Sequence, residues 1–194
     1  MVILNQVNYL ENEMTKRIIL ILMCFSLLGF LLVLNAESPF KYVGAKKCKT
    51  CHNTKKIGKQ YEIWSQGPHA NALKSLSNEA SLKYAKENGI KDPAKEAKCL
   101  KCHATAAAVD KELIDKQTTL ELAEGVSCES CHGPGSHYKT NAIMKNKEKA
   151  LANGLIEPVE KVCITCHNKE NPFYKPFNYK NAAAKIAHPI PGRK

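Results

Sequence analysis

A Cys-x-x-Cys-His pattern occurs four times in this chain, and it limits what the chain can fold into more than any other feature. The four copies are Cys48-Cys51-His52, Cys99-Cys102-His103, Cys128-Cys131-His132 and Cys163-Cys166-His167. Together they use eight of the nine cysteines. The ninth, Cys24, lies inside an apolar N-terminal run with apolar sequence after it, and we interpret it as part of a targeting segment rather than as a lipid-modified cysteine.

Three kinds of chemistry use paired cysteines, and the histidines distinguish them. Disulfides and tetrahedral zinc sites explain the cysteine pairs but leave the four adjacent histidines without a role. In a c-type haem attachment motif every residue is used, because the two thiols form thioethers and the histidine becomes the proximal iron ligand. The sequence therefore predicts four covalently bound haem c groups. They are attached through Cys48, Cys51, Cys99, Cys102, Cys128, Cys131, Cys163 and Cys166, with His52, His103, His132 and His167 as proximal ligands.

The N-terminus has the pattern of an export signal. Lys16 and Arg17 precede an uncharged apolar run from Ile18 to Leu34, and Asn35-Ala36 follows. This pattern predicts that residues 1–36 are a signal peptide cleaved after Ala36, or an N-terminal membrane anchor, since the run is only just long enough to span a bilayer. Residues 37–194 are then one tetrahaem cytochrome c domain in the periplasm. If the anchor is retained, the domain lies on the outer face of the inner membrane.

The chain is basic, with a formal net charge of +11. Such a charge would ordinarily suggest nucleic acid or an anionic surface as the partner, but export argues against nucleic acid. The haem propionates offset much of the positive charge, which leaves a modest surplus for an acidic redox protein. We expect electron-donor and electron-acceptor proteins as partners, contact with a membrane only through an uncleaved N-terminal segment, and a monomer or weak oligomer.

Three histidines lie outside the motifs and are candidates for distal iron ligands, because imidazole suits iron. His69 follows a Gly-Pro turn and is expected in the first turn of a helix that begins at Pro68. His137 is too close to His132 in sequence to reach the opposite face of the same haem easily, so we expect it to ligate a neighbouring haem across the Gly133-Pro134-Gly135 turn. His188 lies on a Pro-flanked tail that is expected to fold over a haem.

Three distal candidates leave one iron without a histidine. Met144 is a possible ligand, but its position beside Ile143 favours an apolar helix face. The fourth haem is then five-coordinate, or is capped by water, a lysine or a residue of another chain.

The expected fold is mainly α with long irregular loops. Four haems leave about 40 residues of the domain for each, too few to surround every macrocycle, so the haems are expected to form much of a compact core. Residues 78–89 and 140–154 are predicted to be helices that end at Gly89 and Gly154, and residues 110–125 are predicted to be helical as well. The Pro- and aromatic-rich tail, 171–194, is predicted to be irregular.

Four segments together resemble the tetrahaem cytochrome c-554 family. They are YVGAKKCKTCH, QYEIWSQGPHANAL, DPAKEAKCLKCH and GVSCESCHGPGSHY, and the resemblance extends over roughly residues 41–188. It implies a mainly helical unit with haems in stacked and perpendicular pairs, three of them bis-histidine and one five-coordinate. By analogy, the haem of the second motif, with His103 as its ligand, is the open one. The family is best known for accepting electrons in bacterial hydroxylamine oxidation, but its relatives also serve other respiratory chains.

These observations favour an exported electron-transfer protein of a respiratory chain, with no catalytic residues, over an enzyme. The first alternative is a haem-based reductase of nitric oxide or a related small nitrogen oxide at the open haem. The second is a subunit of an extracellular cytochrome filament, in which the next subunit supplies the missing ligand.

Overall fold

The computed structural model describes residues 16–18, 20–23, 39–118, 120–188 and 190–191. The chain divides into two compact units, residues 1–39 and 40–194. In the first unit, residues 16–18 and 20–23 are helical. The predicted cleavage point at Ala36, and Cys24, lie outside the described residues. Among the residues that are described, no helix is both long enough and apolar enough to cross a membrane.

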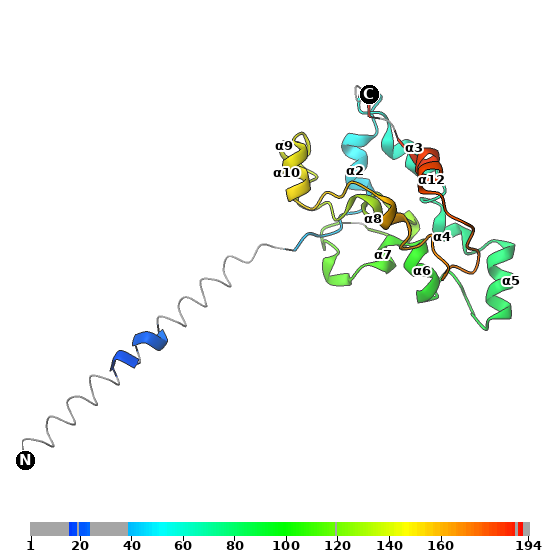
Figure 1. The fold of residues 1–194 in the computed structure, drawn as a ribbon, viewed down its shortest axis with the longest axis horizontal. Helices are drawn as coiled ribbons and strands as arrows, with labels where there is room; N and C mark the ends of the chain where they lie inside the picture. The colour runs from blue at the N-terminus through cyan, green and yellow to red at the C-terminus, as the bar shows by residue number, and fades with distance from the viewer. Residues whose placement is uncertain (1–15, 19, 24–38, 119, 189, 192–194) are drawn as a thin grey trace, which may run out of the picture. The chain divides into compact units, whose positions relative to one another are not determined.

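The second unit consists of short helices joined by long loops (Figure 1). The α-helices are α2 (Ala45–His52), α3 (Gln60–Gln66), α4 (Ala72–Ser75), α5 (Glu79–Glu87), α6 (Ala97–His103), α7 (Thr105–Ala108), α8 (Cys128–His132), α9 (Asn141–Met144), α10 (Lys147–Ala152), α11 (Glu160–Cys163) and α12 (Tyr179–Ile186). Two 3₁₀ turns, η1 (Lys111–Leu113) and η2 (Leu122–Glu124), lie between α7 and α8. Within the described part of the chain, the β structure is a single bridge between Tyr42 and Ile114. The expected mainly α fold is thus confirmed.

The helix predicted at 78–89 is confirmed, and its ends have clear causes. The side chain of Asn78 accepts a hydrogen bond from the Ser81 amide and caps the N-terminus of α5. Gly89, with a φ of 68°, adopts the left-handed conformation that ends a helix at low cost.

Three other predicted elements differ from the structure. Residues 140–154 form two short helices, α9 and α10, because Asn146 leaves the helical conformation and caps α10 through the Lys149 amide. Residues 110–125 form η1 and η2 and no α-helix, since Tyr42 pairs with the backbone of Leu113 and Asp115 instead. The tail is not wholly irregular: α12 forms after Asn178, whose side chain caps the Asn181 amide.

The core made by the described side chains is small. Its central cluster consists of Leu76, Leu100 and Ala104, with Leu73, Ala94 and Cys99 packed against it. A unit of this length normally buries a larger apolar interior. The shortage of buried side chains supports the expectation that a bound group supplies much of the interior.

Candidate haem-binding site

Short helices place the attachment residues of three motifs. The helices α2, α6 and α8 each end at the histidine of a motif, while α11 ends at Cys163, the first residue of the fourth. In a helix, residues three and four apart lie on one face. The first cysteine of a motif therefore shares a face with its second cysteine and with its histidine, as attachment to one planar group requires.

A cavity of about 650 Å³ brings the first and third motifs together. Its walls include Cys48 and His52 from the first motif and Cys128, Cys131 and His132 from the third. Tyr61 and Trp64 of α3 also line it, as does Met144 at the end of α9. The buried hydroxyl of Ser127, on the same wall, makes no hydrogen bond within the described part of the chain. The cavity thus has the size of a ligand pocket, is lined by aromatic rings and sulfur, and has a polar atom left to satisfy.

Two pairs of histidine rings have the separation expected for axial ligands of one metal ion. The centroids of His132 and His188 are 5.9 Å apart, and those of His69 and His167 are 6.1 Å apart. A metal–nitrogen bond of about 2 Å, together with the size of an imidazole ring, puts two axial rings roughly 6 Å apart. Each pair joins a motif histidine to one of the histidines that the sequence suggested as distal ligands.

Backbone carbonyls fix the orientation of two motif histidines. Nδ1 of His103 lies 2.7 Å from the carbonyl oxygen of Ala72, and Nδ1 of His132 lies 3.3 Å from that of Ile156. Because a carbonyl can only accept, Nδ1 carries the proton in both rings, and Nε2 is left to bind a metal.

Burial also favours the neutral form of three histidines that line the cavity. It lowers the pKa of His69, His132 and His188 below the ordinary value for histidine. A neighbouring histidine adds to the effect in each case. The neutral imidazole is the form that ligates iron.

The thiols of different motifs also lie against one another. Contact with the Cys48 thiol, and burial, raise the pKa of the Cys128 thiol. Burial, followed by contact with the Cys166 thiol, raises the pKa of the Cys102 thiol to about 12. The first motif therefore adjoins the third, and the second adjoins the fourth.

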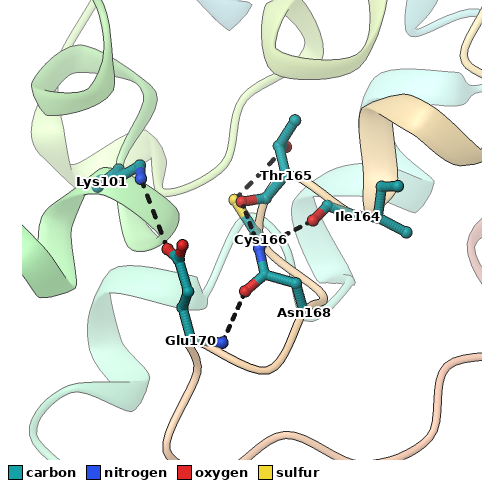
Figure 2. A network of polar contacts seen from close by, with 6 residues as sticks. All are labelled: Lys101, Ile164, Thr165, Cys166, Asn168 and Glu170. Atoms are coloured by element: carbon teal, nitrogen blue, oxygen red, sulfur yellow. Dashed lines mark hydrogen bonds and ion pairs between the residues drawn. The ribbon is translucent and has the colours of Figure 1, made fainter.

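Polar contacts between the second and fourth motifs agree with this pairing, as Figure 2 shows. Lys101, between the two cysteines of the second motif, lies 3.9 Å from the carboxylate of Glu170 just after the fourth. The Glu170 amide in turn donates to the Asn168 side chain, which donates to the carbonyl of Ile164 inside the fourth motif. Both ends of the Lys101–Glu170 pair are exposed, so it contributes little free energy but indicates which motifs are neighbours.

The donor set fits haem better than it fits disulfides or zinc. The eight cysteines of the motifs are all free thiols. In the described residues, no group of three or more His, Cys, Asp or Glu side chains is arranged to hold a metal ion, as a closed zinc site would require. Paired thiols beside a histidine are what thioether attachment of a haem uses.

The other predicted site residues have distinct surroundings. His137 lies edge-on to Phe40, with ring centroids 4.8 Å apart. It is not on the wall of the large cavity, while the neighbouring Ser136 is bonded to Lys41 just before the first motif. Cys99 packs on the small apolar core and Cys51 is exposed. His69 lies in the turn before α4 rather than inside a helix, because α4 begins only at Ala72.

Two buried acids were missed by reasoning from the sequence. Glu129 lies between the two cysteines of the third motif, at a position that the motif leaves unspecified. Glu124 lies in η2 just before this motif. Both carboxylates are buried and bond to the backbone at the start of α2. An attachment motif sets no requirement at its intervening positions, so its spacing gave no signal for either residue.

Comparison with known proteins supports the prediction of covalently bound haem c. The family model described as cytochrome c554 and c-prime matches residues 47–133, which include the first three motifs. The chain is 31% identical over 149 residues to cytochrome c-554 of Nitrosomonas europaea, an alignment that covers 69% of this chain. The aligned part of the chain spans 60% of the length of that relative. No solved structure matches the chain.

Proposed function

Because the chain belongs to the cytochrome c-554 family and carries four covalently bound haem c groups, we propose that it is an exported one-electron carrier of a respiratory chain. In this proposal residues 1–36 direct export to the periplasm, as a cleaved signal or a retained anchor, and residues 37–194 form the tetrahaem domain. Electron-donor and electron-acceptor proteins are its partners. Each bound haem supplies a one-electron Fe(III)/Fe(II) couple.

The observation that carries the proposal is the approach of His188 to His132 and of His69 to His167, each at about the spacing of two axial ligands. An iron with two histidine ligands has no position left for a substrate, so it can change its redox state without binding one. This favours a carrier over an enzyme for these two haems. His69 and His167 are assigned to the fourth haem, and His188 and His132 to the third.

His137 is assigned to the first haem, together with His52. Its segment is bonded to the chain just before α2, since the Lys41 amide donates to the Ser136 hydroxyl at 2.8 Å and the Ser136 amide donates to the Lys41 carbonyl at 3.0 Å. Glu129 also joins the Gly135 amide to those of Val43 and Gly44. These contacts support the expectation that His137 ligates a haem other than that of its own motif.

His103 is then the histidine whose haem has an open position. Its ring is bonded through Nδ1 to Ala72 and lies 3.2 Å from the Ser75 hydroxyl, and the ring contacts found among the described residues bring no second histidine to it. This arrangement favours a single five-coordinate haem, which keeps reduction of nitric oxide or a related small nitrogen oxide as the second candidate function.

Electron paramagnetic resonance of the oxidised, purified protein tests the ligand assignment. We expect three low-spin haems and one high-spin haem, and reversible reduction and oxidation of all four by one-electron reagents. Sustained consumption of nitric oxide by the reduced protein, with turnover comparable to that of a dedicated reductase, would make the enzyme the better description. High-spin signals that disappear as the protein concentration rises, together with growing particle mass, would favour the filament subunit.

A further inference from the structure

Glu129 is a buried acid at a position where haem attachment requires none. It lies on α8 between Cys128 and Cys131, and only 1% of it is exposed. Burying a carboxylate is costly unless hydrogen bonds replace its water. The groups that hydrogen-bond to Glu129 therefore indicate the role of this residue.

Three backbone amides supply those hydrogen bonds. The Gly135 amide donates to Oε1 at 2.7 Å, the Gly44 amide donates to Oε2 at 2.8 Å, and the Val43 amide lies 2.9 Å from Oε1 and 3.0 Å from Oε2. A backbone N–H can only donate, so both oxygens of Glu129 act as acceptors. Burial raises the pKa of Glu129, and the three hydrogen bonds oppose that effect.

These amides belong to two segments next to the first and third attachment motifs. Val43 and Gly44 lie directly before α2, the helix that carries the first attachment motif, and Gly135 closes the turn that follows His132. Glu124 adds a fourth contact, because its Oε2 accepts from the Ala45 amide at 2.9 Å. The first amides of a helix have no partner within the helix, and negative charge is favourable there. The start of α2 is thus held by two carboxylates from the segment around the third motif.

We propose that Glu129 is a positioning residue that fixes the first attachment motif against the third, and so sets the separation and orientation of the two haems that these motifs carry. The inference rests on the proposed haem attachment at both motifs. The contact between the Cys48 and Cys128 thiols, and the cavity shared by His52 and His132, lie next to this connection. Electron exchange between two haems depends on their spacing, so the acid contributes to electron transfer without touching either iron.

The test uses the four-haem protein with Glu129→Gln. The amide side chain has nearly the same shape, but its NH₂ group faces a backbone N–H, so a donor meets a donor. We expect four haems per chain in the pyridine haemochrome assay. We also expect loss of amplitude in the Soret circular-dichroism couplet, which reports how neighbouring haems are oriented, and shifted midpoint potentials for two of the four haems. An unchanged couplet and unchanged potentials would overturn the proposal.

Two glutamine variants separate position from charge. Glu124→Gln keeps an oxygen for the Ala45 amide, and its NH₂ group can take the place of Oε1, which makes no hydrogen bond in the described part of the chain. It should change the couplet less than Glu129→Gln does. An equal change in both would mean that buried charge, rather than position, governs the haem pair. Glu121→Gln, at an exposed residue paired with Lys46, should leave the couplet unchanged.

A further variant, Gly135→Ala, tests the proposal if the Glu129→Gln protein does not acquire its four haems. Gly135→Ala places a Cβ 3.1 Å from Oε1 of Glu129 and 3.1 Å from Cγ2 of Val43, so it crowds the contact without removing charge. We expect a smaller couplet change in the same direction, and an unchanged couplet here would also count against the proposal. The couplet depends on how the haems are oriented and not on electron exchange with a partner protein. Failure of the wild-type protein to exchange electrons would instead refute the proposed carrier function.

Discussion

The imidazole ring of His69 lies 6.1 Å from that of His167, although the first residue follows a Gly-Pro turn before α4 and the second belongs to the fourth attachment motif. If both rings bind one iron, the ligand bonds connect the segment around His69 to the last motif. The ring of Phe177 stacks on that of His167, with centroids 4.8 Å apart and an interplanar angle of 15°. The histidine of the fourth motif thus contacts both a candidate ligand and an apolar ring.

Replacing His69 and Phe177 in turn shows which of these two neighbours of His167 is an iron ligand. We expect His69→Ala to convert one of the four haems from low spin to high spin, because its iron loses an axial ligand. Phe177→Leu is the matched control and should keep all the low-spin signals, since it removes only a packing contact. Electron paramagnetic resonance of the oxidised proteins measures both. A spectrum of His69→Ala that equals the wild-type spectrum would show that His69 is not a ligand.

The haem count per chain depends on the motif cysteines and not on the ninth cysteine. We expect Cys163→Ala combined with Cys166→Ala to lower the pyridine haemochrome value from four haems to three, because both thioether positions of the fourth motif are lost. Cys24→Ala should leave four haems, as expected for a residue of the targeting segment. A decrease caused by Cys24→Ala would contradict the assignment of residues 1–36.

The hydroxyl of Tyr138 should contribute measurably to stability. It donates to the carbonyl of Gly133 at 2.9 Å in a buried setting, and Tyr138→Phe should lower the free energy of unfolding by about 1 kcal/mol because that carbonyl then loses its donor. The half-buried Tyr179 makes a similar bond to the Pro158 carbonyl at 3.1 Å, but that bond is exposed to solvent. Tyr179→Phe should change the free energy by less than about 0.5 kcal/mol. Guanidinium unfolding followed by far-ultraviolet circular dichroism compares the two variants, and equal losses would argue against the burial of Tyr138.

Gly133 should tolerate a side chain less well than Gly89 does. Both have a left-handed φ, of 78° and 68° respectively. A Cβ at Gly133 would lie 2.4 Å from the carbonyl oxygen of Gly154, whereas a Cβ at Gly89 would meet nothing within 4 Å. Gly89→Ala should therefore cost about 1–2 kcal/mol, the conformational penalty alone.

Gly133→Ala adds a backbone clash to that penalty, so it should cost more than Gly89→Ala and reduce the yield of four-haem protein. Thermal unfolding of the purified variants and the haem content of the expressed protein measure these effects. Comparable unfolding temperatures for the two variants would contradict the close approach of Gly133 to Gly154.

Local signals predicted some elements and not others. The 78–89 helix was predicted correctly because its cap, Asn78, and its stop, Gly89, are adjacent to it in sequence. Residues 110–125 contain helix formers, yet Tyr42 pairs there with Leu113 and Asp115 and draws the segment into an extended contact. In the tail, the Asn178 cap and the alanines after it were a helix signal that the neighbouring prolines and aromatic residues outweighed in our prediction.

The sequence by itself determined the chemistry of the site, because covalent haem attachment needs two thiols and an imidazole at fixed spacing in a short stretch of chain. It also identified His69, His137 and His188 as the candidate distal ligands. Only the tertiary structure decided which motif adjoins which, that His188 approaches His132 while His69 approaches His167, and that Glu124 and Glu129 hold the start of α2. These contacts join residues far apart in the chain. They depend on how loops close and where buried polar groups find partners, and local sequence patterns carry no record of either.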